Sequence, residues 1–279
     1  MNKKTKGNIV HRTSSIVHHT SYTTHRTSHI LSVLLILFLI TTTANAQINA
    51  EHMLRIGRNA MFYDDYALSI SYFNRVIEAK PHLYEPYYYR GLAKFYLEDY
   101  TGAEIDMDQA IRLNPYFPNT YEVRALSRIN QNKFAEAAED YEKASKLQED
   151  NRTIWHNMAL CYLEIDSISL ADSTATTITR KWPKSADGHV LRAEIQIKQG
   201  DSIQAEHHAD QALHVDKFNE AALLIKAGLL MNREAYNEAE TYYDEAIRLQ
   251  PKNPRTIINR ALCRYHQNNY RGTLSDYDL

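Results

Sequence analysis

Residues 84–117 read YEPYYYRGLAKFYLEDYTGAEIDMDQAIRLNPYF and predict two short amphipathic helices joined by a tight turn. In the second half, Ala103, Met107 and Ala110 recur at i, i+4 and i+7, the spacing of one apolar stripe on a helix. Pro115 ends this helix, because proline has no N–H to continue the hydrogen-bond ladder. A helix pair this small cannot bury both of its apolar faces, so the sequence predicts further copies on either side.

The chain supplies those copies at a constant period of 34 residues. Two small residues recur in phase, and they let the two helices of each pair lie close together. The first small position holds Gly57, Gly91, Ala125, Ala159, Ala193, Ala227 and Ala261, and the second holds Ser69, Ala103, Ala137, Ala171, Ala205, Ala239 and Thr273. The closing proline recurs as Pro81, Pro115, Pro183 and Pro251.

This pattern resembles the tetratricopeptide repeat (TPR). A large aromatic residue stands four positions before the first small residue, as at Tyr87, Tyr121 and Trp155. The resemblance implies an all-α, right-handed superhelical solenoid of antiparallel helix pairs, without cofactor, that holds a protein or peptide partner. It covers about six and a half repeats, which start near residues 50, 84, 118, 152, 186, 220 and 254.

The first 46 residues differ from the repeats. They contain five basic residues and no acid, and residues 30–40 (ILSVLLILFLI) form an uncharged apolar run. The small-x-small triplet 44–46 (ANA) predicts signal-peptide cleavage before Gln47. A transmembrane anchor is the alternative, but it needs about 20 apolar residues. We therefore expect a disordered leader and signal peptide over 1–46 and a solenoid over 47–279. The protein would be exported, periplasmic or secreted, and would contact a membrane only through the uncleaved signal.

Charge and motifs exclude several function classes. The first 46 residues contribute +5 to a net charge of −2, so the remaining residues carry −7. An acidic body without a basic stripe argues against a nucleic-acid partner. No phosphate loop, paired-cysteine motif or nucleophile elbow is present, so no catalytic residues are predicted. Cys161 and Cys263 lie three repeats apart, too far for a disulfide, and are expected to be buried free thiols.

An arginine precedes the first small residue in several repeats, and in three of them an aspartate follows sixteen residues later. The co-occurrence predicts structural ion pairs that tie together the two helices of one repeat. The predicted pairs are Arg90–Asp106, Arg124–Asp140 and Arg260–Asp276.

Two further features have competing interpretations. His207, Asp210 and His214 share one helical face and could bind zinc. The repeat register places them on an outer face with nothing opposite, so a solvated polar face is favoured and no metal is expected. The second helix of the fourth repeat, residues 170–182 (LADSTATTITRKW), is rich in β-branched threonines, which predicts looser packing there.

The TPR resemblance also implies that the first helix of each repeat lines the partner-binding face. Aromatic surfaces suit peptide grooves because rigid rings offer large contact area at low entropic cost. The alternative is that these rings pack against neighbouring helices. The predicted partner-binding residues are Phe62, Tyr88, Leu92, Phe95, Tyr96, Leu126 and Ile129. Later repeats offer a more mixed wall of Glu194, Ile197, Lys198, Met231, Asn232, Tyr265 and His266.

A subset of the family grips C-terminal carboxylates with Lys and Asn side chains on consecutive first helices. Asn157 and Asn259 resemble parts of that clamp, but Leu224 and Gly228 stand where partners are needed, so the clamp is absent. We expect a protein-binding scaffold. Two alternatives stay open: a subunit of an envelope-assembly or enzyme complex whose activity lies beyond Leu279, or a glycan-binding solenoid.

Overall fold

The computed structural model describes residue 32 and residues 50–278, and within them it contains helices and turns and no strand. The all-α prediction is therefore confirmed. The predicted leader and signal peptide lie outside the described residues, apart from Ser32. None of the described helices combines the length and the apolar character needed to cross a membrane.

The described residues fall into two compact units, one ending at Arg90 and one beginning at Gly91, and each is considered by itself. In the first unit, helical residues 50–62 pack on α2 (Tyr66–Ala79) around Ala50, Met53 and Val76. Gly57 permits this approach, because a Cβ atom there would lie 2.6 Å from the ring of Phe73.

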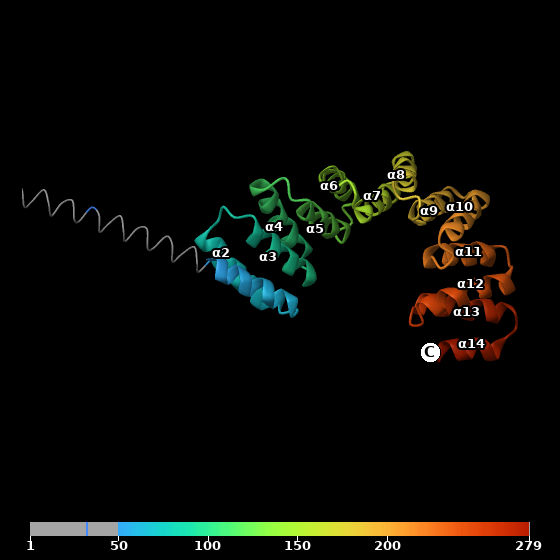
Figure 1. Cartoon of the computed structure of the whole chain (residues 1–279). Helices are drawn as coiled ribbons and strands as arrows, with labels where there is room; N and C mark the ends of the chain where they lie inside the picture. The colour runs from blue at the N-terminus through green and yellow to red at the C-terminus, as the bar shows by residue number, and fades with distance from the viewer. Residues whose placement is uncertain (1–31, 33–49, 279) are drawn as a thin grey trace, which may run out of the picture. The chain divides into compact units, whose positions relative to one another are not determined.

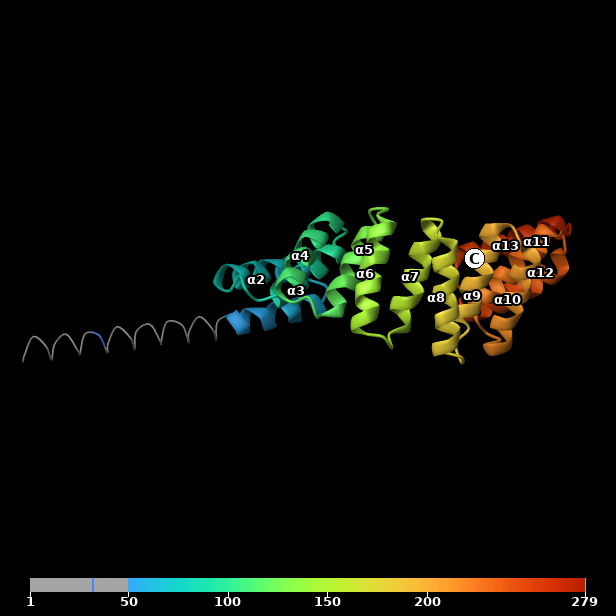
Figure 2. The ribbon, with the colours of Figure 1, turned by 90° about the horizontal axis from the view of Figure 1, so that it is seen from above.

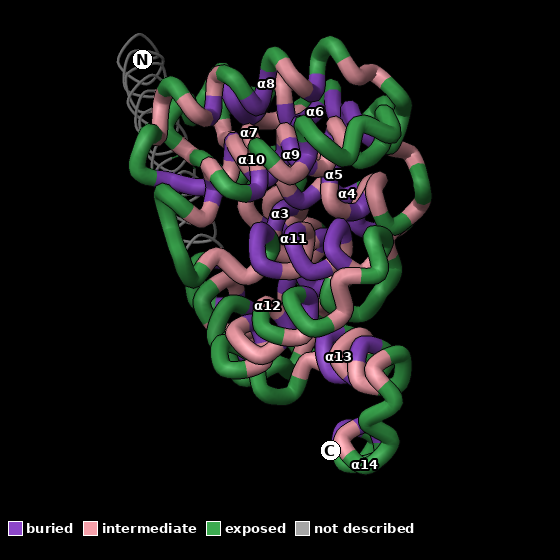
Figure 3. The backbone as a smooth tube through the Cα atoms, turned by 90° about the vertical axis from the view of Figure 1, so that its right-hand side faces the viewer, coloured by how far each residue is buried: buried purple, intermediate pink, exposed green. Residues whose placement is uncertain are grey.

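The second unit is a row of helices in which each contacts the next, from α4 to α14 (Figure 1). Figure 2 shows α5 to α8 side by side, and Figure 3 shows exposed turns between helices whose buried parts face their neighbours. The helices are α3 (Glu85–Tyr96, which begins in the first unit), α4 (Tyr100–Leu113), α5 (Pro118–Ile129), α6 (Phe134–Leu147), α7 (Arg152–Glu164), α8 (Ile168–Lys181), α9 (Asp187–Gln199), α10 (Ser202–Val215), α11 (Glu220–Asn232), α12 (Tyr236–Leu249), α13 (Pro254–His266) and α14 (Tyr270–Tyr277).

The small residues of the repeat lie where helices meet. Ala103, Ala125, Ala137, Ala159 and their counterparts through Ala261 have no exposed surface. At Gly91, an added Cβ would lie 2.7 Å from the Met107 Cε atom and 3.2 Å from the Ala103 carbonyl oxygen. Gly91 and Ala103 therefore face each other as predicted, and a larger side chain would force their helices apart.

Each hairpin turn contains one residue in the left-handed backbone conformation, and these residues also recur every 34 positions. Only one of the seven is glycine, with φ of 79° at Gly200. Left-handed φ values cost non-glycine residues stability, least for Asn and Asp. The other six are Asp64, Glu98, Asn132, Asp166, Glu234 and Asn268, with φ of 55–62°.

The threonine-rich α8 forms a complete helix. Thr174, Thr176, Thr177 and Thr179 each donate a hydroxyl hydrogen bond to the carbonyl oxygen four residues earlier, at 2.7–3.0 Å. This local bonding satisfies the hydroxyl groups within the helix. α8 also packs closely against α9 at Gly188, where an added Cβ atom would lie 2.9 Å from the Ala175 carbonyl oxygen.

Both cysteines are buried free thiols, as predicted. Burial raises the pKa of the Cys161 thiol to about 12 and that of Cys263 to about 11. Neither is therefore a thiolate at neutral pH.

Candidate functional site

A groove of about 580 Å³ opens along the first helices of repeats five, six and seven, namely α9, α11 and α13. We refer to it as the α9–α11–α13 groove. Its wall is largely apolar, with one carboxylate and two amides, as expected of a site that binds part of another molecule. The lining residues are Glu194, Ile197, Ala221, Leu224, Ile225, Gly228, Leu229, Met231, Asn232, Tyr243 and Asn259.

One register position creates the hollow. The residue after the first small position is leucine in four repeats, at Leu92, Leu126, Leu160 and Leu262. In repeats five and six it is Glu194 and Gly228, and both line the groove.

Gly228 is not required by helix packing, because a Cβ atom added there would meet no atom within 4 Å. A glycine inside a helix costs about 1 kcal/mol relative to alanine. The chain therefore bears this cost at a position where the missing side chain leaves open space.

Glu194 brings a carboxylate to the same groove. The residue is half-buried, and it has no hydrogen-bond or ion-pair partner among residues 50–278. Burial, with no cation to offset it, raises the pKa of this carboxyl group.

The rest of the wall is fixed by local contacts. The Cys263 thiol donates to the Met231 Sδ atom, with the two sulfur atoms 2.9 Å apart, so Met231 contacts α13. Lys198, the basic residue nearest Ile197 on α9, pairs with Asp166 at 2.9 Å and donates to the Leu163 carbonyl oxygen. Lys198 is therefore engaged away from Glu194.

The predicted wall of repeats one to three divides between the two units. In the first unit, Phe62 is 81% exposed, whereas Tyr88 is only 8% exposed and packs edge-on against Tyr89. The burial of Tyr88 fits the alternative interpretation, in which the ring packs between helices.

In the second unit, Tyr96 is 53% exposed and its ring is edge-on to Phe95. Leu92, Leu126 and Ile129 are half-buried, and Ile129 packs against the core of repeats three to five. A partner-binding role for these residues stays a prediction.

Ion pairs also join neighbouring helices of the array, and their fullest form surrounds Asp140 of α6. Arg124 of α5 contacts Asp140 through Nη2 and Nε at 2.5 and 2.9 Å. Arg128 reaches the same carboxylate at 2.8 Å. The Asp140 side chain is 3% exposed, so two guanidinium groups compensate one buried charge.

Arg124 also crosses to the preceding repeat. Its Nη1 atom lies 2.6 Å from Asp108 on α4. The predicted Arg124–Asp140 pair is therefore present. The prediction was incomplete, because Arg124 joins α5 to the second helix of the preceding repeat as well as to that of its own repeat.

Glu104 of α4 extends this network to the same neighbours. It accepts hydrogen bonds from Arg128 at 2.8 Å, Lys133 at 2.8 Å and Gln131 at 3.1 Å. Burial alone would raise its pKa, but these donors outweigh burial and lower the pKa of the carboxyl group to about 2.

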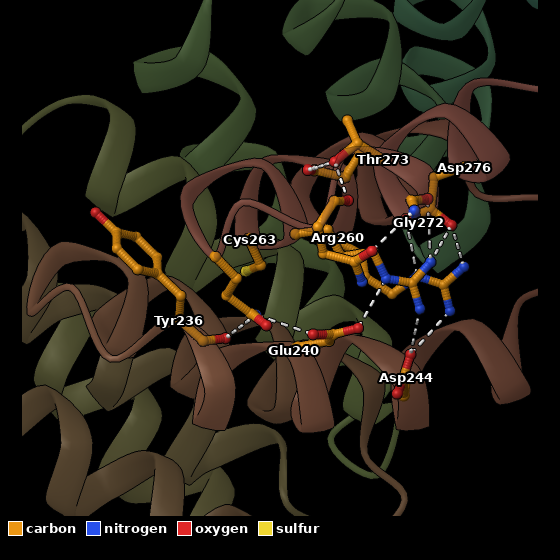
Figure 4. A network of polar contacts seen from close by, with 12 residues as sticks. Tyr236, Glu240, Asp244, Arg260, Cys263, Gly272, Thr273 and Asp276 are labelled. Carbon is orange, nitrogen blue, oxygen red and sulfur yellow. Dashed lines mark hydrogen bonds and ion pairs between the residues drawn. The ribbon is translucent and has the colours of Figure 1, made fainter.

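The same network recurs four periods later, between α12, α13 and α14 (Figure 4). Arg260 contacts Asp276 at 2.5 Å and Asp244 at 2.8 Å, and it lies between the two carboxylates in Figure 4. Arg264 contacts Asp276 and Glu240, both at 2.7 Å. The Arg260–Asp276 pair is thus present like Arg124–Asp140.

Other repeats keep only part of the network. Lys226 stands at the register of Arg124 and contacts Glu206 at 3.0 Å and Asp210 at 2.8 Å, both on α10 of the preceding repeat. Arg90, in the first unit, donates to Asn74 at 2.7 Å, and the predicted Arg90–Asp106 pair stays a prediction. Asp106 itself lies 2.9 Å from Lys94.

No group of three or more His, Cys, Asp or Glu side chains within the described residues is placed to hold a metal ion. Of the residues that the sequence singled out, Asp210 pairs with Lys226 and His207 lies 3.1 Å from the Gln211 amide. Both groups therefore have partners of their own.

The fold and the groove together define a class: an array of stacked helix pairs with a hollow on its first helices. Comparison with known protein families identifies the kind of helix pair in two parts of the array. A family model described as "Tetratricopeptide repeat" matches residues 190–254, and another with the same description matches residues 118–151. Tetratricopeptide repeats are therefore present over residues 118–151 and 190–254.

Individual relatives agree. "Small glutamine-rich tetratricopeptide repeat-containing protein 2" of Saccharomyces cerevisiae is 30% identical over 110 residues, 39% of this chain and 32% of that protein. Human "Protein O-mannosyl-transferase TMTC3" is 26% identical over 163 residues, 55% of this chain and 17% of that protein. The chain thus spans well under half the length of the curated relatives it matches.

Among solved structures, yeast Tom70 superposes with a TM-score of 0.61 at 20% identity, covering 82% of this chain and 49% of that one. At this identity the similarity shows the fold. The solenoid architecture predicted from the 34-residue period is confirmed.

The sequence predicts the partner-binding residues in repeats one to three. Four groove residues are predicted only as part of a more mixed wall, namely Glu194, Ile197, Met231 and Asn232. The sequence signal for the groove is that Glu194 and Gly228 replace the leucine that follows the first small residue in four other repeats.

Proposed function

We propose that this chain is a scaffold that binds a protein or peptide partner in the α9–α11–α13 groove. The observation that carries the proposal is the open space at Gly228, within an apolar hollow of about 580 Å³. A glycine that packing does not need, and that costs helix stability, is accounted for when the space is filled by a ligand.

The test blocks the groove with a bulky side chain introduced at one of its own lining residues. A library of displayed random peptides is selected on the full chain, and the selected peptides are measured on Gly228→Trp, Gly228→Ala and the exposed control Thr241→Trp. We expect Gly228→Trp to weaken binding by about tenfold or more, since the indole would occupy the hollow. The other two variants should bind like the wild type. Failure to select any peptide, or equal binding by Gly228→Trp, would reject the groove.

The same peptides test the wall predicted in repeats one to three. Tyr96→Ala removes its most exposed ring in the second unit. Peptides that lose affinity on Tyr96→Ala but not on Gly228→Trp would move the site to that wall.

We further propose that the chain is exported, on the basis of the apolar run 30–40 and the cleavage triplet 44–46. Expression of the full reading frame in a bacterial host, followed by N-terminal sequencing of the protein from each cell fraction, tests this. A mature chain beginning at Gln47 outside the cytoplasm is expected. An uncut chain held in the cytoplasm would refute export.

A further inference from the structure

We propose that the α9–α11–α13 groove selects a partner segment carrying a lysine or arginine, whose cationic head pairs with Glu194 and whose stem lies over Gly228. This inference rests on the proposed function and names the chemistry of the partner. It is the opposite of a carboxylate clamp, since the fixed charge in the groove is negative.

The first step is the charge of Glu194. A carboxylate drawn out of water without a compensating cation is costly, and the cost is relieved when a cation enters. Glu194 has no such cation among residues 50–278, whereas Glu206 of α10 contacts both Lys226 and Arg233.

The second step is the position of the neighbouring basic groups. Lys226 is on the same helix as Gly228 but contacts α10, and Lys198 contacts Asp166 in the turn before α8. Both ammonium groups pair with other carboxylates, so neither pairs with Glu194. A cation for Glu194 must therefore come from outside residues 50–278, and a bound partner would supply it.

The third step is shape. Lysine and arginine have long aliphatic stems that pack on apolar surface while the head remains polar. The space left by Gly228 is bordered by Leu224 and Met231, which suit such a stem. Asn232 and Asn259 line the same groove and offer amide donors and acceptors to a peptide backbone.

The fourth step is the field of the whole repeat region. Residues 47–279 carry a formal net charge of −7. An acidic surface speeds encounter with basic segments and disfavours acidic ones. The local and the overall charge therefore favour the same class of partner.

The experiment uses four pools of fluorescein-labelled peptides of about nine residues. Each pool has random Ala, Leu, Ser and Asn positions around a fixed central Lys, Arg, norleucine or Glu. Norleucine has the shape of the lysine stem without its charge. Binding to the full chain is measured by fluorescence anisotropy at low and high salt.

We expect the Lys and Arg pools to bind about tenfold to a hundredfold tighter than the norleucine pool, the effect of one charge-assisted contact. The Glu pool should bind weakest. Glu194→Gln should abolish the preference for Lys and Arg, while the exposed control Glu139→Gln should keep it. Glu194→Lys should reverse it in favour of the Glu pool.

The outcomes separate the two proposals. If all pools bind the wild type equally and lose affinity on Gly228→Trp, the groove binds peptides and the charge inference is overturned. If binding ignores Gly228→Trp, or no pool binds, the proposed function itself fails. Glu194→Gln is nearly isosteric and exposes no new apolar surface. Its retained preference for Lys and Arg would overturn the inference even if Glu194→Lys did not fold.

Discussion

Repeats three and six use the same helix positions in opposite ways. In repeat three, Arg124 joins Asp108 to the buried Asp140, and Leu126, two residues later, occupies the first-helix face. In repeat six, both ion pairs of Lys226 join it to the preceding repeat, and Gly228 leaves that face open. Tyr242 replaces the aspartate, and its ring lies 5.9 Å from the Lys226 Nζ atom.

The comparison separates the positions that hold the array together from the positions that shape its first-helix face. The cationic position and the small residues lie between helices, where change disturbs packing. The leucine register lies on the first-helix face, where change creates or fills a hollow. One helix can therefore keep its place in the array while the residues of its first-helix face vary.

The largest effect should come from the arginine. Arg124→Leu leaves the buried Asp140 with Arg128 alone, and loss of one partner from a buried ionic cluster should lower the free energy of unfolding by about 3 kcal/mol. Lys226→Met is the matched change in repeat six. Its carboxylate partners are 25% and 56% exposed, so the loss should stay below about 1 kcal/mol.

Both variants are measured by urea unfolding followed by circular dichroism. Equal losses would show that burial of the carboxylate does not distinguish the two repeats.

The two glycines should respond in opposite directions. At Gly188, a Cβ would lie 2.2 Å from Thr179 Oγ1 and 2.9 Å from the Ala175 carbonyl oxygen, so Gly188→Ala should destabilise by about 2 kcal/mol. At Gly228 there is open space, and Gly228→Ala should stabilise by about 0.5–1 kcal/mol.

Thermal unfolding of the two alanine variants beside the wild type checks this. A stabilising Gly188→Ala would mean that α8 and α9 separate at little cost.

The smallest effects should appear in acid, with opposite signs. The folded-state pKa of Glu104 is about 2, below the ordinary 4.5. Its stabilisation is therefore complete above about pH 4.5 and is lost as the pH falls toward 2. Glu104→Gln should cost about 1 kcal/mol at neutral pH and show a shallower loss of stability in acid.

Glu194 has a raised pKa, so its ionisation destabilises the fold as the pH rises above the ordinary value. Glu194→Gln should therefore gain up to about 1 kcal/mol at neutral pH, and the gain should vanish in acid. Urea unfolding at several pH values gives both curves. Parallel curves for the two variants would contradict the contrast between a paired and an unpaired carboxylate.

Much of the fold could be predicted from sequence because the 34-residue period is a packing constraint. Small residues at Gly91 and Ala103 mark a close approach, and Pro115 marks an end, whatever the partner. The Arg124–Asp140 pair was predictable because both residues change together within one repeat. Its link to Asp108 was not, because that bond joins different repeats.

The groove was harder to predict because it is defined by a missing side chain at Gly228 and by the missing partner of Glu194 among residues 50–278. A glycine after a small residue looks like another packing position until its surroundings are known to be empty. The unpaired state of Glu194 depends on where Lys198 and Lys226 point, which periodicity does not determine. The hydroxyl bonds within α8 show that its threonines are compatible with a complete helix, and the looser packing expected there stays a prediction for hydrogen exchange to test.

The left-handed turn residues have a consequence for how the array can evolve. Glu98 and Glu234 hold φ values of 62° and 60°, a conformation that glycine adopts without steric cost. Substitution by glycine at either turn should recover up to about 1 kcal/mol, as turn optimisation commonly does. The helical glycine at Gly228 and the unpaired Glu194 each cost a similar amount. Glycine substitutions in the turns could thus offset the loss of stability that a new groove causes, without altering helix packing.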